Sequence, residues 1–529
     1  MIILYNPQSS ANRKPILPMS LLAVGAVLEG QYDYCILDGN LEDDPLAALD
    51  AQIRQAGPQP ILACTVMPGP QLQQAVPLCR ELKQRHPHLT IIWGGYFPTQ
   101  HWDAVLRSPF VDYVVRGHGE HAFRRLIDWL HAPPEMHVQM QQLHLTATSA
   151  DPAAPPFPGI AYRPAAGAAA ATDGATTTGG ATAAAAPVSN PLAPIPHPTA
   201  LPPWNFDRVP VARYVRRTFL GDRTLGYHSS YGCPFFCNFC AVVNMVNGRW
   251  LPQNAQTIAN VAEMYAQRWG VNAIEFYDNN FFTSEKRVAE FCQELLRRKL
   301  KLRWWGEGRI DTMQKYSPET WRLMRDAGLH MVFMGAESGS DETLKRMDKG
   351  GTMTAAKTLD MARLMQQWDI IPEFSFVMGN PPDPEADARQ TMAFIRQVKA
   401  VNPAAEIIMY LYTPVPLAGD LYDEAQADGF TFPETLEEWV SPAWLEFSQR
   451  RSRTMPWVKQ PLQARLYDFE RVLNAYYPTS TDARLTPAWR RVLRAISAWR
   501  YRLQFYRYPL ELRALHKLIA YQRPETSGF

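Results

Sequence analysis

Short apolar runs alternate with helical apolar stripes along the first ~140 residues. Runs of strand length occupy 1–5, 34–37, 60–66, 90–93 and 113–115, and between them Leu21 to Leu28 and Leu72 to Leu82 repeat apolar residues at helical spacing. Strands that alternate with amphipathic helices predict a doubly wound α/β domain with a parallel sheet. In such sheets ligands bind beyond the carboxyl ends of the strands. The glycines expected there are Gly39, Gly94, Gly95, Gly117 and Gly119.

The same alternation returns after about residue 206. Expected strands lie at 225–230, 273–278, 303–309, 331–339, 371–379 and 406–412, and helices such as 285–299 and 318–326 lie between them. Six strand–helix units predict a partial (β/α)6 barrel over residues 206–430. The chemistry of barrels gathers at the C-terminal ends of the strands, so the residues that follow these runs are the candidates for a site.

Two regions fall outside these alternations. Residues 141–205 are expected to be a linker, because the tract 165–186 is almost entirely Ala, Gly and Thr, a composition that buries little and predicts disorder. Residues 431–529 are expected to form a mainly helical C-terminal region. The chain is therefore expected to divide into a doubly wound domain (1–140), a linker (141–205), a barrel (206–430) and helices (431–529).

The net charge of +2 conceals a basic C-terminus. From Arg451 onward there are 15 Lys/Arg and 5 Asp/Glu, a local net charge of +10. Within this part, Trp489, Val492, Leu493, Ile496 and Trp499 make an apolar helical stripe flanked by arginines. The stripe predicts either a helical cap packed on the barrel, or contact with anionic membrane lipid, which basic amphipathic helices bind. Nucleic acid is not expected, because no recognised binding module accompanies the charge.

Cysteine use and the lack of an apolar leader indicate a cytoplasmic protein. The chain has seven Cys, an odd number, and no apolar run near the ~20 residues that span a bilayer. The basic C-terminus leaves peripheral association with the inner face of the membrane as an alternative.

The most specific chemical pattern is the run Cys233-Pro-Phe-Phe-Cys237-Asn-Phe-Cys240. Three thiolates at this C-x3-C-x2-C spacing predict three ligands of a cubane iron–sulfur cluster whose fourth iron has no protein ligand. An open iron is a reaction site, whereas the four-cysteine sets of electron carriers close the cluster. A zinc site is the alternative, but zinc takes four ligands, and the nearest histidine, His228, lies outside the loop.

This run, with Phe239 before its third cysteine, resembles the signature of the radical S-adenosylmethionine (SAM) enzymes. The resemblance implies a [4Fe–4S] cluster on the three cysteines, SAM on the open iron, and Phe239 near the SAM adenine. It also implies cofactor contacts at four strand ends. These are Asp278, where the family often has a turn that grips the SAM amino group, Arg309, Glu337 in Gly335-Ala-Glu-Ser-Gly-Ser340, and Gly379 in Gly379-Asn-Pro-Pro382.

Two loops of the first domain resemble those of the cobalamin-binding domain that precedes many radical SAM cores. They are Gly94-Gly95-Tyr96-Phe97-Pro98-Thr99 and Arg116-Gly117-His118-Gly119-Glu120, and the resemblance implies that Gly94, Gly95, Gly117 and Glu120 bind cobalamin. Tight turns that need glycine are the alternative interpretation. Asp38-Gly39-Asn40 stands where methionine-synthase-type domains supply an axial histidine, so no histidine is expected on cobalt, and His118 and His121 are expected to be surface or turn residues.

Across residues 1–430 the chain also resembles the anaerobic magnesium-protoporphyrin IX monomethyl ester cyclases, and more broadly the P-methyltransferase-like class. The resemblance implies an enzyme that generates a 5′-deoxyadenosyl radical and then methylates a carbon of, or oxidatively cyclises, an apolar intermediate such as a tetrapyrrole or a lipid. An external donor such as flavodoxin or ferredoxin would reduce the cluster. The alternative from another class is a non-catalytic cobalamin- or metal-binding regulatory protein.

Overall fold

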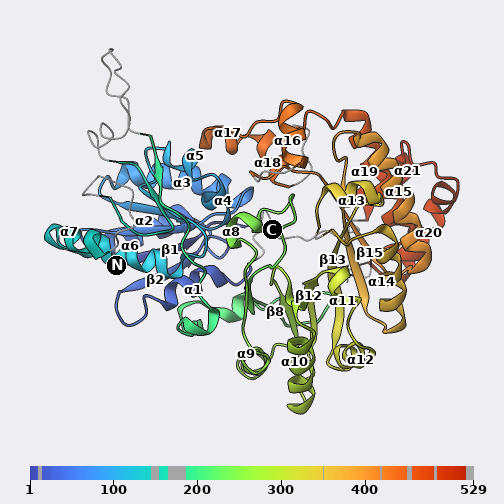
Figure 1. The fold of residues 1–529 in the computed structure, drawn as a ribbon, viewed down its shortest axis with the longest axis horizontal. Helices are drawn as coiled ribbons and strands as arrows, with labels where there is room; N and C mark the ends of the chain where they lie inside the picture. Colours follow the sequence, from blue (N-terminus) through green and yellow to red (C-terminus); the bar gives the residue numbers. More distant parts are fainter. Residues whose placement is uncertain are drawn as a thin grey trace. The chain divides into compact units, whose positions relative to one another are not determined.

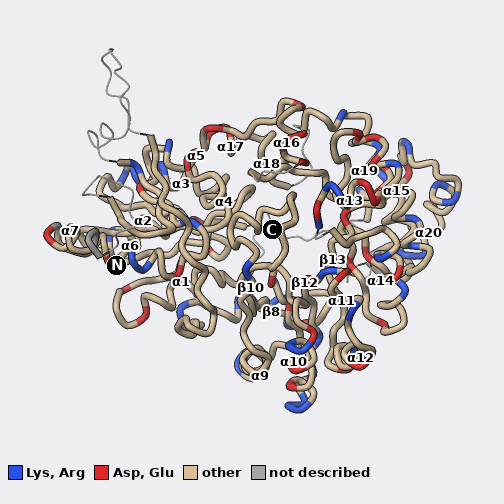
Figure 2. The backbone as a smooth tube through the Cα atoms, in the orientation of Figure 1, with Lys and Arg blue, Asp and Glu red and all other residues tan. Residues whose placement is uncertain are grey.

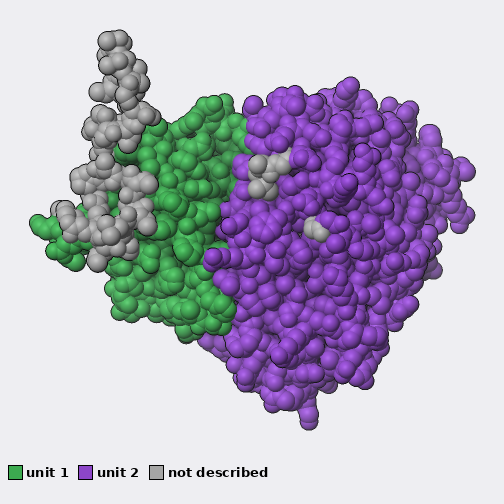
Figure 3. Space-filling view, viewed as in Figure 1, with its two compact units in different colours: residues 1–210, 432–448, 528–529 green, residues 211–431, 449–527 purple. Residues whose placement is uncertain are grey.

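The computed structural model describes residues 1–9, 15–143, 154–164, 186–349, 351–416, 420–449, 455–479, 481 and 485–519. The chain forms two compact units (Figures 1 and 3). Unit 1 contains Met1–Pro210 and Phe432–Ser448, and unit 2 contains Val211–Thr431 and the described residues from Gln449 onward. The residues expected to form one C-terminal helical region, 431–529, are therefore divided between the two units.

Unit 1 is built on a seven-stranded sheet with the order β2-β1-β3-β4-β5-β6-β7. Strands β1 to β5 are parallel, and β6 and β7 extend the β5 edge in antiparallel pairing. The strands are β1 (Ile2–Asn6), β2 (Tyr34–Asp38), β3 (Ile61–Thr65), β4 (Thr90–Gly94), β5 (Tyr113–Val115), β6 (Ile160–Tyr162) and β7 (Val188–Ser189). This order confirms the doubly wound fold, with its topological switch point between β1 and β3.

Helices of unit 1 pack in pairs, α1 with α6 and α2 with α3. They are α1 (Met19–Ala26), α2 (Pro45–Gln55), α3 (Pro70–Arg85), α4 (Tyr96–Gln100), α5 (Trp102–Leu106), α6 (Gly119–His131) and α7 (Pro134–Leu143). Helix α2 begins where the sequence provides a cap, since the Asp44 side chain accepts from the Ala47 amide and Pro45 follows it. Leu4, Ile92, Phe123 and Leu126 belong to the buried core that joins the sheet to the helices.

Strands β6 and β7 come from the expected linker. Asn190, beside β7, donates its amide to the carbonyl oxygens of Pro155 (2.9 Å) and Phe157 (2.8 Å), which fixes the two flanks of the insertion to each other. Most of the Ala/Gly/Thr tract expected to be disordered, residues 165–185, lies outside the described residues. The insertion thus interrupts a pair of strands that belong to the sheet.

A segment that follows the barrel returns to unit 1. It contains α17 (Leu436–Trp439) and α18 (Pro442–Ser448). Trp439 packs edge-on against Phe97 of α4 at 5.0 Å between ring centroids, and His101 lies 4.6 Å from the same indole. Arg80 and Arg107 form ion pairs with Glu437 and Glu434, but these pairs are exposed and contribute little. Buried aromatic packing therefore provides most of the attachment.

Unit 2 is built on six parallel strands with the order β15-β14-β13-β12-β11-β8. They are β8 (Thr224–Tyr227), β11 (Ala273–Phe276), β12 (Arg303–Gly308), β13 (Leu329–Glu337), β14 (Ile371–Met378) and β15 (Glu406–Leu411). The connecting helices are α9 (Ala255–Trp269), α10 (Glu285–Arg297), α11 (Ile310–Met313), α12 (Pro318–Asp326), α13 (Asp341–Arg346), α14 (Ala355–Gln367), α15 (Pro384–Val401) and α16 (Asp420–Ala427). Among the described strands β8 and β15 are the two edges, so the expected partial barrel is confirmed.

The first barrel strand is shorter than the expected run 225–230. Strand β8 ends at Tyr227, and the chain then enters a second strand, β9 (Ser230–Gly232), which pairs antiparallel with β10 (Trp250–Pro252). The cysteine run and the short helix α8 (Val242–Val246) lie between these two strands. The β9–β10 pair therefore closes the base of the cysteine loop.

Three C-terminal helices complete unit 2: α19 (Gln460–Tyr476), α20 (Pro487–Arg502) and α21 (Leu510–Leu518). Tyr501 of α20 stacks on Tyr476 of α19 at 4.4 Å, and Arg396 of α15 donates to the Tyr501 carbonyl oxygen (2.6 Å). In the described parts of the chain no helix has the length and apolar character needed to cross a membrane.

Candidate cofactor sites

The three cysteines lie in the loop between β9 and α8, at the carboxyl end of the barrel strands. Gly232 precedes the loop with φ +83°, and a Cβ there would lie 2.2 Å from the Arg249 carbonyl oxygen, so only glycine fits. Within the loop, the Cys240 amide donates to the Cys237 carbonyl oxygen at 3.1 Å. Cys237 is buried, and Cys233 and Cys240 are half-buried. The thiols are thus shielded without being sealed from ligands.

The segment 346–349 after α13 holds the far side of the cysteine loop. The Asn238 side-chain amide donates to the Arg346 carbonyl oxygen (2.6 Å), and Arg309 donates to the Lys349 carbonyl oxygen (2.7 Å). The loop is therefore fixed from both sides, which a rigid metallocluster site requires.

Arg309 connects this segment to a cysteine. Its guanidinium donates to Cys237 Sγ (3.3 Å), pairs with Asp311 (2.7 Å) and lies 3.8 Å over the ring of Phe235. Burial raises the pKa of the Cys237 thiol, and the positive charges of Lys349 and Arg309 oppose that effect. Two cations that face a thiol favour its thiolate form, so this donor set fits an anionic thiolate-ligated cluster.

Glu337 ends β13 in a left-handed conformation, with φ +63°, at a break in register with β14. Such a backbone is uncommon for a residue other than glycine and is typical of functional sites. Its carboxylate accepts from Lys349 Nζ (2.6 Å), which also donates to the Gly335 carbonyl oxygen. The carboxylate expected to contact SAM is therefore paired with Lys349, and both side chains are buried.

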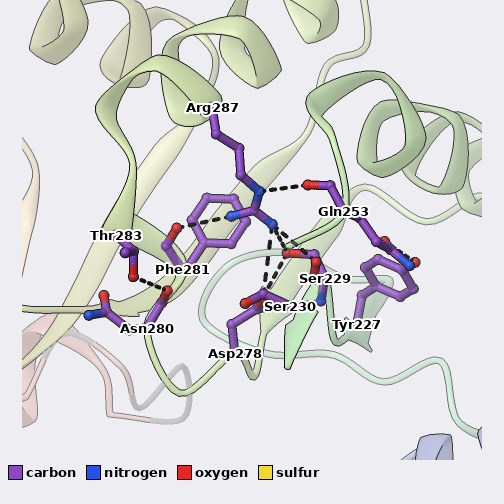
Figure 4. Close-up of polar contacts among 9 residues, drawn as sticks. All are labelled: Tyr227, Ser229, Ser230, Gln253, Asp278, Asn280, Phe281, Thr283 and Arg287. Atoms are coloured by element: carbon purple, nitrogen blue, oxygen red, sulfur yellow. Dashed lines mark hydrogen bonds and ion pairs between the residues drawn. The ribbon is translucent and has the colours of Figure 1, made fainter. Parts of the chain in front are cut away.

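Asp278, also expected to contact SAM, points instead toward the corner between β8 and β9 (Figure 4). It is fully buried and accepts from the Ser229 amide (3.0 Å), from Ser229 Oγ (2.8 Å) and from the Ser230 hydroxyl. Arg287 lies 4.0 Å away and also donates to the Phe281 and Gln253 carbonyl oxygens. With its oxygens occupied, Asp278 shapes the entry to the cysteine loop.

Two buried asparagines, Asn280 and Asn380, and the half-buried Asn238 have polar atoms without a partner. Neither amide atom of Asn280, directly after β11, has a hydrogen-bond partner in the described structure, and the same holds for Oδ1 of Asn238 and Oδ1 of Asn380. Burial raises the pKa of the Cys233 thiol, and the nearby Asn280 amide opposes that effect. Buried polar atoms without partners are costly, and such atoms on the loops after β9, β11 and β14 indicate a polar ligand at this end of the barrel.

The loop after β14 is fixed by one carboxylate. The Gly379 amide (3.1 Å) and the Asn380 side chain (3.0 Å) both donate to Asp387, and Trp457 donates to the Gly379 carbonyl oxygen (3.1 Å). Gly379 has φ +72°, which requires glycine. Phe239 is half-buried in the cysteine loop. Phe239 and Gly379, both expected to contact SAM, thus lie on loops that the fold holds in place.

In unit 1 the expected cobalamin residues lie at the ends of β4 and β5. Gly95 has φ +98°, and a Cβ there would lie 3.2 Å from the Val66 amide nitrogen; Gly117 has φ +75°. Glu120 begins α6 and is buried, and its Oε2 has no partner among the described residues. The unpaired Oε2 of the buried Glu120 in the first turn of α6 fits a polar ligand at this edge.

The end of β2 and the loop after it, Asp38-Gly39-Asn40, contain no histidine. Asn40 and Asn6 both donate to Asp38 Oδ1, at 2.7 and 3.0 Å, so polar side chains occupy the ends of β1 and β2. His121 is exposed. His101 packs against Phe97 and Trp439, and burial lowers its pKa to about 3, so it stays neutral.

Neither a single-metal cluster nor the one surface depression described below competes with the cysteine loop as a site in the described residues. The described residues contain no group of three or more His, Cys, Asp or Glu close enough for a single metal ion; a cubane cluster instead places each cysteine on its own iron. A surface depression of about 520 Å³ is lined by Leu220, Asn272, Lys299 and Arg303. It lies at the amino ends of the strands, opposite the cysteine loop.

Sequence reasoning did not identify Asn280, Asn238 or Lys349. Asn280 was visible as the residue two positions after Asp278 at a strand end, but the sequence does not show which of the two has free polar atoms. The role of Lys349 depends on a contact across 12 residues, for which no local pattern exists.

Two family models match the chain. One is described as the B12 binding domain and matches residues 13–127, and the other is the Radical SAM superfamily and matches residues 227–395. The first therefore lies in unit 1 and the second in unit 2, with the cysteine loop inside it.

Two known proteins are similar along most of the chain. The uncharacterized methyltransferase PH0819 of Pyrococcus horikoshii is 21% identical over 403 residues, 75% of this chain and 78% of the relative. The anaerobic magnesium-protoporphyrin IX monomethyl ester cyclase of Synechocystis sp. is 24% identical over 380 residues, 70% and 67%.

A solved structure has the same fold. The cobalamin-dependent SAM radical enzyme OxsB, with aqua-cobalamin and SAM bound, aligns with a TM-score of 0.59 at 17% identity. The alignment covers 83% of this chain and only 56% of OxsB. Together with the cysteine loop, these likenesses show that the chain combines a B12 binding domain with a Radical SAM domain and has the fold of a cobalamin-dependent SAM radical enzyme.

Proposed function

We propose that this enzyme methylates a carbon of, or closes a ring in, an apolar biosynthetic intermediate, with a tetrapyrrole or a lipid as the substrate class. One relative described above is named a methyltransferase and the other a cyclase, so the comparisons support both reactions. When bound, the cluster and SAM supply a radical that abstracts hydrogen, and cobalamin supplies a transferable methyl group. The non-catalytic alternative gains no support from these relatives.

The observation that carries the proposal is the set of unpaired asparagine amide oxygens around the cysteine loop. Asn280, Asn238 and Asn380 each present a free acceptor, and Asn280 also a free donor, on three loops at one end of the barrel. We assign the cluster to the three loop cysteines, and the polar groups of SAM to Asn280 and Glu337. Lys349, which pairs with Glu337, would then lie beside the bound cofactor.

Other residues act by position. Arg309 and Lys349 offset negative charge beside Cys237, and Asp278 with Arg287 fixes the corner that leads into the loop. In unit 1, Gly94, Gly95, Gly117 and Glu120 are the residues we assign to cobalamin. An external one-electron donor such as a flavodoxin or ferredoxin reduces the cluster in this proposal, and the basic C-terminal helices bring the enzyme to a membrane that holds the substrate.

Anaerobic reconstitution tests the proposal. With a reductant, the enzyme should form 5′-deoxyadenosine and pass a deuterated methyl group from labelled SAM to a component of extracted lipids or tetrapyrroles, detected by mass spectrometry. Formation of a dehydrogenated ring product without label would select cyclisation. No 5′-deoxyadenosine from a protein that has its full iron content would refute the proposal.

One pair of variants tests the assignment of Asn280. Asn280→Ala should weaken SAM binding about tenfold or more, because one or two hydrogen bonds to a charged ligand are lost. Asn279→Ala, at the exposed neighbouring position, is the matched control and should leave SAM affinity unchanged. Equal SAM affinity of the Asn280 variant and the wild type would remove Asn280 from the site.

A further inference from the structure

Large apolar side chains are exposed mainly at one place on the described surface. Twelve large hydrophobic residues are exposed, and eight of them lie between positions 489 and 518. These eight are Trp489, Val492, Trp499, Leu503, Phe505, Tyr508, Leu510 and Leu518. Isolated apolar residues on a surface need no explanation, but a cluster of this kind marks an interaction site. We call residues 487–518, which contain α20 and α21, the C-terminal hairpin.

The exposed side of α20 has two stripes. Val492, Trp499 and Leu503 are seven and eleven residues apart, and at 100° per residue they fall on one line along the helix. Arg491 and Arg502 fall on a second line about 90° around the helix from it, and Figure 2 shows basic positions along this helix. The opposite side, with Leu493, Ser497 and Tyr501, is buried against the rest of unit 2. The apolar and basic stripes therefore both face solvent.

The connection between α20 and α21 is held rigidly with its apolar side chains outward. Arg500 is buried and donates to the carbonyl oxygens of Arg507 (2.9 Å) and Tyr508 (3.1 Å). It also forms an ion pair with Glu511. Leu503 is 73%, Tyr508 70% and Leu510 64% exposed. Because a buried arginine fixes the loop backbone, this exposure is built into the fold.

The charge around these side chains has one sign. Residues 485–519 contain eight Lys/Arg and one acidic residue, Glu511, which Arg500 already pairs. The side chains of Arg491, Arg507 and Lys517 are exposed and make no hydrogen bond or ion pair within the described structure. By contrast Arg490 donates to the Leu485 carbonyl oxygen and Arg513 pairs with Asp468, so these two stabilise the fold.

We propose that the C-terminal hairpin docks on an anionic lipid bilayer, with Leu503, Tyr508 and Leu510 in the interface and Arg491, Arg507 and Lys517 on the headgroups. Apolar residues beside unpaired cations on a fixed loop match the requirements of interfacial binding. A second copy of the chain fits less well, because a two-fold interface would place these cations against themselves. The inference rests on the proposed function only in giving the membrane a purpose, namely access to an apolar substrate.

Co-sedimentation of the full chain with liposomes tests the inference. The wild type should bind vesicles that contain phosphatidylserine more tightly than pure phosphatidylcholine vesicles, and added salt should weaken binding. The triple variant Arg491→Gln, Arg507→Gln, Lys517→Gln should bind about a hundredfold more weakly, at about fivefold per cation. Lys286→Gln, Arg297→Gln, Arg363→Gln removes the same charge from exposed positions elsewhere and should bind as the wild type does.

A second variant separates insertion from attraction by charge. Leu503→Gln, Leu510→Gln should reduce binding at high salt and leave the circular dichroism spectrum unchanged, since both side chains are exposed. Equal affinity of the two triple variants for phosphatidylserine vesicles would overturn the inference. So would a concentration-dependent dimer in sedimentation analysis that this apolar variant abolishes, because the hairpin would then bind a second copy. Vesicle binding needs no cofactor, so its failure leaves the proposed reaction standing.

Discussion

Replacing Glu373 by Gln tests the electrostatics of the barrel interior. Glu373 lies on β14 and is buried, and its carboxylate accepts from Trp305 Nε1 at 3.1 Å. Glu406 lies opposite it on β15. Burial, with the nearby charges of Glu406 and Glu275, raises the pKa of Glu373 from 4.5 to about 7. The folded protein therefore holds this proton more tightly than the unfolded chain does.

The size and sign of the effect follow from that shift. A pKa difference of about 2.5 units corresponds to about 3 kcal/mol. The stabilisation is complete below about pH 4.5, is lost as the pH rises through about 7, and changes little above that value. Gln keeps an acceptor for Trp305 and has no proton to lose, so the variant lacks this dependence.

Thermal melting of the full chain measures the difference. Between about pH 5.5 and about pH 8.5 the wild type should lose about 2 kcal/mol relative to Glu373→Gln, or about 4 °C in Tm for a unit of this size. Glu319→Gln, at an exposed position on α12, should melt in parallel with the wild type. Parallel curves for Glu373→Gln as well would refute the reasoning, because they would show that Glu373 is ionised in the folded protein.

Four further outcomes are expected. The triple alanine variant of the cysteine loop should lose the about four irons that the reconstituted wild type binds, and Cys292→Ala, buried in α10, should keep them by iron analysis. Lys349→Met should lower the midpoint potential of the cluster in an EPR-monitored titration, and Lys349→Arg should restore it, because a cation beside Cys237 favours the reduced form; equal potentials would contradict this. Bound cobalamin should show no nitrogen coupling on cobalt(II) in its EPR spectrum, and such coupling would reveal a histidine ligand. Trp439→Ala, which removes the aromatic contact with Phe97, should destabilise unit 1 by about 3 to 5 kcal/mol and release cobalamin, measured by absorbance. Unchanged stability would show that this contact is dispensable.

A substitution of Gly95 alone would not test cobalamin binding. A side chain there meets the Val66 backbone and a left-handed φ, so the loop itself would be strained whether or not cobalamin binds. Glu120→Gln is the cleaner test, because Glu120 Oε2 has no partner in the described structure. The comparison shows that a glycine at a strand end has a structural reason in addition to any functional one.

The amino-acid sequence by itself determined the parallel strands of both sheets, because their signals are local. Apolar runs of strand length between amphipathic helices predicted β1 to β5 and the six barrel strands, and the cysteine spacing predicted the cluster loop. Errors occurred where strands end. The run 225–230 contains no Gly or Pro after Gly226, so nothing local showed that the chain turns at His228. The carboxylate of Asp278, 49 residues from Ser229, decides that corner.

The tertiary structure alone decided which polar groups are free. Asp278 and Asn280 are two residues apart on the same strand end, yet one has its oxygens occupied by Ser229 and Ser230 and the other has an unpaired amide. The partners come from other elements, and sequence spacing carries no information about them. The same reason explains the return of residues 432–448 to unit 1, where Trp439 packs against Phe97. Hydrogen-bond satisfaction and packing depend on contacts between segments far apart in the chain, and only the folded chain brings those segments together.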